Sequence, residues 1–329
     1  MRADEHGIRT TGRPGETVVP VVRGRPRRSG AARAAAVLAA GCALTLVAGT
    51  ACAQGGDAGS EAPDEGLAGA RPPEQRGDVT TVERPDLESV FDDAGVEGTF
   101  VLHDTRARES TVVGADAAHE RAVPASTFKM ANTLIGLETG AVSGLDEVLP
   151  YGGEPQRVDA WEQDMSLREA FPASNFPVYQ ELARRVGHER MAAWVDRFEY
   201  GNRDVGGEDV RDRFWLEGPL EISAVEQTEF LASLARAELP ADRAHQEALR
   251  EIALVEEGDG HTLYAKSGWA VDVDPAPGWW VGWVERGADL YTFALRMEMD
   301  EDANAELREP LARELLVELG ALPGEAAGD

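Results

Sequence analysis

Residues 127–139 carry only two charged side chains, Lys129 and Glu138. A helix without a charged face has to be buried on every side, so this segment predicts a central helix around which the rest of a domain packs. The stretch follows Pro124-Ala125-Ser126 and stops at Gly140, as a helix with a glycine cap would. Lys129 is therefore expected to be removed from water from the start.

Lysine occurs at only two positions, Lys129 and Lys266, whereas all other Lys or Arg positions hold arginine. Arginine stays protonated at any working pH, but a buried lysine can lose its proton and become a neutral amine. Retention of lysine at these two positions indicates amine chemistry. Lys129 closes Ser126-Thr127-Phe128-Lys129, an S-x-x-K pattern, and Lys266 opens Lys266-Ser267-Gly268, a K-[ST]-G pattern.

The first 53 residues predict an export signal, because an arginine-rich opening leads into an apolar run over residues 35–51. Cleavage before Cys52 would leave a lipidated cysteine that attaches the protein to the membrane. Ala51-Cys52-Ala53 also fits an A-x-A site for soluble secretion, and an uncleaved anchor is a third alternative. We expect an exported protein, either extracellular or anchored to the outer face of the cytoplasmic membrane. Cys42 would leave with the signal, so no internal disulfide is expected.

Composition indicates the domain boundaries in the remainder of the chain and argues against nucleic acid and metal ions as ligands. Residues 54–86 contain almost no large apolar side chain and are expected to form a disordered tether, followed by a catalytic domain over 87–322 and a tail over 323–329. A net charge of -28 argues against nucleic acid. The six histidines form no H-x-H or H-E-x-x-H spacing, so no metal site is expected. The sequence leaves the oligomeric state open.

The order of expected elements predicts an α+β fold. Strands are expected at 98–103 and 111–113, and again at 262–271, 279–285 and 290–299, where apolar and polar residues alternate in the last. Helices are expected at 127–139, at 177–186, from the capping box at Ser223 toward Pro240, and from Pro310 to Gly320. This order favours an antiparallel sheet completed by both ends of the chain and flanked by helices, with an inserted helical lobe and a site in the cleft between.

Ser126 and Lys129 are three residues apart, so on a helix their side chains share a face and can meet. Serine is a poor nucleophile until a base takes its proton, and a neutral buried amine, or something made from one, can supply that base. A serine at a helix N-terminus also gains from nearby backbone N–H groups, which stabilise the oxyanion of acyl transfer. The pair predicts nucleophilic catalysis at Ser126.

Further motifs follow in a fixed order along the chain. They are Ser174-Asn175-Phe176, Tyr200-Gly201-Asn202, Phe214-Trp215-Leu216-Glu217-Gly218-Pro219-Leu220, Lys266-Ser267-Gly268-Trp269 and Gly278-Trp279-Trp280-Val281-Gly282-Trp283. With Ser126-x-x-Lys129, this set resembles the class D β-lactamases, the oxacillinase group, across nearly all of residues 87–322. The resemblance implies the serine β-lactamase/penicillin-binding transpeptidase-like fold and small β-lactam molecules as substrates.

The resemblance also implies a mechanism. Lys129 would be carboxylated by CO2 or bicarbonate to a carbamate, with no cofactor bound as a separate molecule, and would then act as general base for acylation of Ser126 and for deacylation. Only an unprotonated amine attacks CO2, and burial favours that form. The resulting anion needs hydrogen-bond donors, and Trp215 would supply its indole N–H.

Other roles are carried over on the same grounds. Ser174 would relay a proton to the lactam nitrogen with help from Lys266, and the backbone N–H groups of Ser126 and Trp269 would form the oxyanion hole. Substrate contacts are expected from Ser267, Gly268, Trp269 and Arg308, and support for the cleft from Trp215, Tyr200, Asn202, Phe176 and Leu216.

The chain departs from the family pattern at two positions. Phe176 stands where a small branched apolar residue usually lies beside the modified lysine, and Ser267 replaces a frequent threonine. A larger ring could crowd the carbamate or the route of water and slow deacylation. The main alternative is therefore a penicillin-binding or β-lactam sensor domain that is acylated on Ser126 but turns over poorly. A cell-wall peptidase would use the same nucleophile. Trp279, Trp280 and Trp283 are expected to pack in the core rather than to contact substrate.

Overall fold

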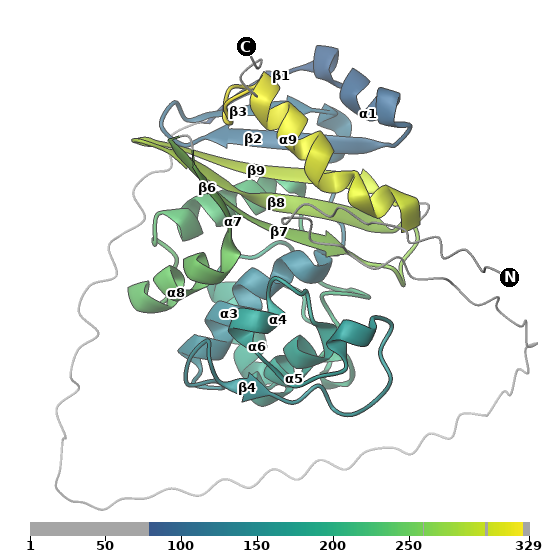
Figure 1. Ribbon diagram of the computed structural model, residues 1–329, viewed down its shortest axis with the longest axis vertical. Coiled ribbons are helices and arrows are strands. Elements are labelled where there is room, and N and C mark those ends of the chain that lie inside the picture. Colours follow the sequence, from purple (N-terminus) through teal and green to yellow (C-terminus); the bar gives the residue numbers. More distant parts are fainter. Residues whose placement is uncertain (1–78, 259, 300–301, 325–329) are drawn as a thin grey trace, which may run out of the picture. The chain divides into compact units, whose positions relative to one another are not determined.

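The computed structural model describes residues 79–258, 260–299 and 302–324 (Figure 1). The predicted export signal, residues 54–78 of the predicted tether and the end of the predicted tail lie outside the described residues. Within the described ranges, each helix is too short or too polar to cross a lipid bilayer.

Seven strands of the described chain form one sheet in the order β1-β3-β2-β9-β8-β7-β6. All neighbours are antiparallel except β1 and β3, and the pairing of β2 with β9 joins the N-terminal hairpin to the C-terminal strands, as the sequence predicts. Strands β4 and β5 form a separate small pair. The strands are β1 (Thr80–Glu83), β2 (Gly98–Asp104), β3 (Glu109–Val113), β4 (Val148–Leu149), β5 (Met165–Ser166), β6 (Leu254–Gly258), β7 (His261–Trp269), β8 (Pro277–Arg286) and β9 (Asp289–Glu298).

Helices cover both faces of this sheet (Figure 1). Helices α1 and α9 pack on one face, while α7 packs on the other and the block formed by α3, α5, α6 and α8 continues from it. The helices are α1 (Ser89–Ala94), α2 (Ala115–Ala118), α3 (Lys129–Glu138), α4 (Leu167–Ala170), α5 (Phe176–Val186), α6 (His188–Arg197), α7 (Ala224–Ala235), α8 (Arg243–Ala253) and α9 (Arg308–Glu318). The predicted α+β fold with an inserted helical lobe is confirmed.

Strand β8 separates two apolar cores. Trp279 and Trp283 enter the core between the sheet and the helical block, whereas Trp280 and Val284 enter the core under α1 and α9. Successive side chains of a strand point to opposite faces, so a strand buried on both sides is apolar at nearly every position. The three tryptophans are therefore core residues, as predicted.

The central helix is buried as predicted but begins differently. Every residue of α3 from Lys129 to Leu137 is buried. The residues before it, Ala125–Phe128, form a separate 3₁₀ turn rather than the first turn of the α-helix. Ala125 has a φ of 51° there, a left-handed conformation that is uncommon for a residue with a side chain. Tertiary contacts described below hold this turn, and a sequence pattern does not reveal them.

The predicted tether boundary at residue 86 is wrong, since ordered structure begins earlier. Strand β1 pairs in parallel with β3 although its four side chains are all exposed. Backbone bonds hold it, from Thr80 N–H to the Arg108 carbonyl at 3.0 Å and from Arg84 N–H to the Val112 carbonyl at 2.8 Å. An edge strand held by backbone bonds alone leaves no hydrophobic signature in the sequence. The helix that opens at Ser223 also ends at Ala235, short of Pro240.

Gly282 provides a test of the packing between β7 and β8. A Cβ atom at this position would lie 2.9 Å from Ala265 Cα and would also run into the Tyr264 carbonyl, and backbone atoms have little room to retreat. Gly282→Ala should therefore lower the free energy of unfolding by about 1–3 kcal/mol, measured by urea denaturation. Gly144→Ala is the matched control, because no atom lies within 4 Å of its added Cβ. Equal stability of the two variants would contradict the packing described.

Candidate active site

Ser126 lies on the strained 3₁₀ turn, where its side chain remains partly exposed. The Ala125 N–H donates to the Trp215 carbonyl at 2.8 Å, and the Trp279 indole N–H donates to the Val123 carbonyl at 2.9 Å. The loop that carries Trp215 and the sheet thus hold the turn from two sides. A strained backbone persists where surrounding contacts over-determine it, and such positions cluster at functional sites.

Thr127, a residue of the same turn, also stabilises it through hydrogen bonds. Its hydroxyl donates to the Pro124 carbonyl at 2.7 Å and accepts from the Gln227 side-chain amide of α7 at 2.9 Å. Tyr200 is buried beside this pair, and burial raises the pKa of its phenol. The sequence did not indicate Gln227 as a site residue. The residues around it in α7 predict a capped helix but not a contact with Thr127, one hundred positions earlier.

The Lys129 amine lies 2.7 Å from the Ser126 hydroxyl oxygen. The lysine side chain has no exposed surface, and its amine lies over the Tyr179 ring, 5.2 Å from the ring centre. Burial, with a smaller repulsion from Lys266, holds the pKa of Lys129 well below its ordinary value of 10.5. A neutral amine in contact with a serine hydroxyl is the arrangement that proton abstraction requires.

The second predicted pair also meets. The Lys266 amine donates to the Ser174 hydroxyl at 2.6 Å and to the Ser267 carbonyl at 3.0 Å. Burial and the nearby Arg308 lower the pKa of Lys266 to about 7. Ser174 has a φ of 52°, so its loop is also held in the left-handed region. Near neutral pH, Lys266 can therefore both give and accept a proton through Ser174.

Strand β7 touches the nucleophile turn at Gly268. A Cβ atom there would lie 3.0 Å from the Pro124 carbonyl oxygen and 3.3 Å from the Thr127 nitrogen, so a larger residue would fit only if the turn moved by a few tenths of an ångström. Arg308, the first residue of α9, donates to the Gly268 carbonyl at 2.5 Å and to the Ala305 carbonyl at 2.8 Å. Burial lowers the pKa of Arg308 to about 10. The guanidinium thus lies beside Ser267 and Trp269, the predicted substrate contacts.

Trp215 is fully buried and stacks on Phe128, with 5.7 Å between the ring centres. Its indole N–H has no hydrogen-bond partner among the described residues. Asn202 braces the end of the same loop, because its amide donates to the Pro219 carbonyl at 2.8 Å and accepts from the Glu221 N–H at 3.1 Å. Leu216, which follows Trp215 in the sequence, is half-buried against the core.

Phe176 is half-buried at the start of α5, where the Asn175 side chain caps the helix, and its ring packs on Trp161 with 6.4 Å between the centres. The aromatic ring over the Lys129 amine is that of Tyr179, one helical turn later. Tyr179 was not singled out from the sequence, because its place against α3 follows from the packing of the two helices.

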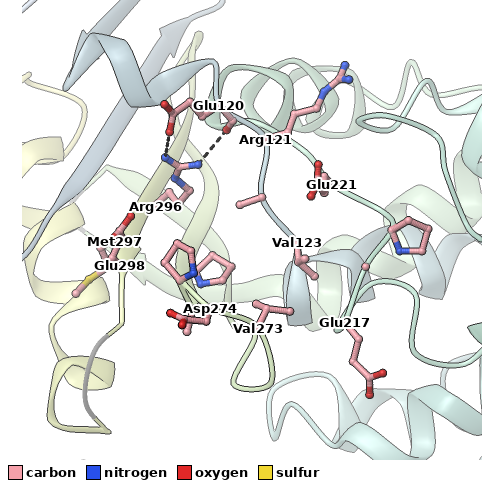
Figure 2. Close-up of a pocket in the computed structure, with 16 residues that line it drawn as sticks. Glu120, Arg121, Val123, Glu217, Glu221, Val273, Asp274, Arg296, Met297 and Glu298 are labelled. Atoms are coloured by element: carbon pink, nitrogen blue, oxygen red, sulfur yellow. Dashed lines mark hydrogen bonds and ion pairs between the residues drawn. The ribbon is translucent and has the colours of Figure 1, made fainter. Parts of the chain in front are cut away.

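A separate hollow of about 520 Å³ lies beside Val123, three residues before Ser126 (Figure 2). Val123, Val273 and Pro219 line it, and Arg296 and Glu120 form an ion pair of 3.2 Å at its wall. The catalytic side chains described above do not line this hollow. The described residues bring together no group of three or more His, Cys, Asp or Glu side chains that could hold a metal ion.

The lowered pKa of Lys266 has a consequence for stability. Because its pKa of about 7 in the folded protein lies below the ordinary 10.5, the unfolded chain binds this proton more tightly between these two values. The wild type should therefore gain stability relative to Lys266→Met as the pH rises from 7 to 10, by at most about 1.4 kcal/mol per pH unit. Urea denaturation of both proteins in CO2-free buffer measures this difference. A difference that does not change with pH would show that Lys266 is not perturbed.

Comparison with known proteins agrees with this geometry. Residues 97–317 match the family model described as "Penicillin binding protein transpeptidase domain". Beta-lactamase OXA-5 of Pseudomonas aeruginosa is 39% identical over 237 residues, which cover 71% of this chain and 88% of the relative. Beta-lactamase OXA-48 of Klebsiella pneumoniae is 34% identical over 227 residues, 69% of this chain and 85% of the relative.

A solved structure supports the same assignment. The crystal structure of FUS-1 (OXA-85), a class D β-lactamase from Fusobacterium nucleatum subsp. polymorphum, superposes with a TM-score of 0.70 at 37% sequence identity. The match covers 73% of this chain and all of that one. The predicted resemblance is confirmed: the chain belongs to the penicillin-binding transpeptidase family and, within it, to the class D serine β-lactamases.

Proposed function

We propose that this protein hydrolyses β-lactam antibiotics through an acyl-enzyme on Ser126, with N-carboxylated Lys129 as general base for acylation and deacylation. The observation that carries the proposal is the fully buried Lys129 amine, 2.7 Å from the Ser126 hydroxyl. Burial lowers the pKa of that amine well below its ordinary value, which favours the unprotonated form that the proposal requires. The membership of the class D group supports β-lactam hydrolysis.

The surroundings of Lys129 fit a carbamate. In its formation the amine nitrogen bonds to the carbon of CO2 and a proton leaves, so a neutral group becomes an anion. A buried anion needs donors and opposite charge. The unpaired indole N–H of Trp215 supports the first requirement, and Lys266, whose charge opposes a cationic Lys129, would instead stabilise an anion there.

The neighbouring residues supply the remaining parts of acyl transfer. The Ser126 oxygen would attack the lactam carbonyl, and the bond from that carbon to the ring nitrogen would break. The Lys266 amine lies 2.6 Å from the Ser174 hydroxyl oxygen, and these two groups would deliver the proton that the ring nitrogen requires. Ser267 and Arg308 would bind the substrate carboxylate beside Gly268, and the backbone N–H groups of Ser126 and Trp269 would stabilise the oxyanion.

Turnover of a chromogenic cephalosporin by the purified protein, with and without bicarbonate, tests the proposal. We expect hydrolysis that increases when bicarbonate is added to CO2-depleted enzyme. Mass spectrometry of the reaction distinguishes the alternatives. A stable adduct on Ser126 without turnover would favour the penicillin-binding or sensor function, and the absence of both turnover and adduct would exclude both functions.

Lys129→Arg should lower kcat by at least about a thousandfold, within the range that a general base contributes. Arginine keeps its proton and cannot capture CO2, whatever the bicarbonate concentration. The control is Arg243→Lys, the reverse exchange at an exposed position of α8 far from the site in sequence, which should retain wild-type turnover. Substantial hydrolysis by Lys129→Arg would rule out Lys129 as the base.

Trp215→Phe keeps a ring in the core but removes the unpaired N–H donor. We expect kcat to fall about tenfold or more at ambient CO2 and to recover partly as bicarbonate is raised, because a weaker carbamate needs more CO2 to form. Trp283→Phe removes another buried indole N–H without a partner, in the sheet core against Tyr264, and should leave the bicarbonate response unchanged. Identical bicarbonate titrations for the two variants would argue against a carbamate bound by Trp215.

A further inference from the structure

Two loops meet through an ion pair that no catalytic role requires. The loop over residues 150–164 joins β4 to β5, and the turn over 270–276 joins β7 to β8. Arg157 of the first loop and Asp272 of the second form an ion pair of 3.5 Å between Nη2 and Oδ1. The two residues are 115 positions apart, so the contact connects the helical lobe to the sheet.

The Arg157 loop is anchored beside Ser174. Its Trp161 donates from the indole N–H to the Ala173 carbonyl at 3.0 Å and packs on the ring of Phe176. Ser174 lies between these two contacts in the sequence. The loop is also braced internally, for example by the Gln156 N–H, which donates to Glu162 at 2.9 Å. The position of Arg157 is therefore coupled to that of Ser174.

The Asp272 turn is anchored beside Ser126. The next residue, Val273, packs against a small apolar cluster of Val123, Ala125 and Ala270. Ala125 immediately precedes the nucleophile, and Ala270 follows the predicted oxyanion-hole residue Trp269. On the other side of Asp272, the Val271 side chain is 38% exposed. The turn therefore places the exposed Val271 side chain and the Asp272 carboxylate next to β7, the strand that carries Lys266.

The helical lobe and the sheet are therefore connected twice, once through Ser174 and Lys266 and once through Arg157 and Asp272. We propose that the Arg157–Asp272 ion pair is a strap across the mouth of the active site that discriminates among β-lactams by the size of the acyl side chain. This inference rests on the proposed function. A compact substrate reaches Ser126 with the strap closed, whereas a bulky side chain has to part the pair.

The ion pair is weak enough to open when a bulky substrate enters. The side chains are 51% and 59% exposed, so water and salt screen their attraction. An exposed ion pair of this kind changes a rate by about two- to fivefold when it has to open, and not by orders of magnitude.

The test compares two β-lactams that share one ring system and differ only in acyl side chain, one compact and one bulky. The readout is the rate of Ser126 acylation in the full chain, followed by mass spectrometry, which does not depend on turnover. Arg157→Gln and Asp272→Asn should each raise the ratio of the bulky to the compact rate about two- to fivefold. The charge-swapped double variant, Arg157→Asp with Asp272→Arg, should return the ratio toward that of the wild type.

Arg243→Gln is the matched control, because it breaks an ion pair of 2.8 Å with Glu247 whose side chains are also more than half exposed but lie on α8. It should leave the ratio unchanged, whereas high salt should move the wild type toward the single variants. An unchanged ratio in both single variants, or equal acceleration of both substrates, would overturn the strap while leaving the proposed function intact. A wild type that neither substrate acylates would overturn the proposed function.

Discussion

The removal of one amine from water is the constraint on which the rest of this structure depends. Lys129 belongs to a helix that is buried along its length, and the sheet and helical block are built around that helix. Burial makes the charged amine unfavourable, and this favours an unprotonated nitrogen 2.7 Å from the Ser126 oxygen, as the proposed chemistry requires. Arginine could not replace it, which explains why lysine survives here in a chain that otherwise uses arginine.

The cationic groups of the site form a graded series. Burial, with a smaller repulsion from Arg308, lowers the pKa of Lys266 to about 7, and burial, with a smaller repulsion from Lys266, lowers the pKa of Lys129. Burial therefore favours the neutral amine at both Lys266 and Lys129. The same arrangement would attract an anion, either a substrate carboxylate near Arg308 or a carbamate on Lys129.

Much of the fold could be predicted from the sequence, because its signals are local. The alternation of apolar and polar residues in β9 and the capping box at Ser223 are properties of short segments, and the structure confirms the elements they predict. The motif residues Ser126, Lys129, Ser174 and Lys266 also meet in the two expected pairs.

The remaining features depend on contacts between distant segments. Strand β1 is held by backbone bonds to an edge, and the 3₁₀ turn at Ser126 is held by Trp215 and Gln227 as well as by its own Thr127. The ring over the Lys129 amine is Tyr179 because α5 crosses α3 there, and Phe176 turns toward Trp161. No periodicity or motif in one segment encodes such pairings.

The most direct test of the account is an NMR titration of the protein labelled at the lysine Cε carbon. The chain contains only two lysines, so two resonances are expected and Lys266→Met assigns them. In CO2-free buffer, the account predicts that the Lys129 resonance is already that of a neutral amine at pH 7 and shows no transition near the ordinary 10.5. A Lys129 resonance that titrates near 10.5 would show a permanently charged amine at neutral pH and would contradict the proposed chemistry.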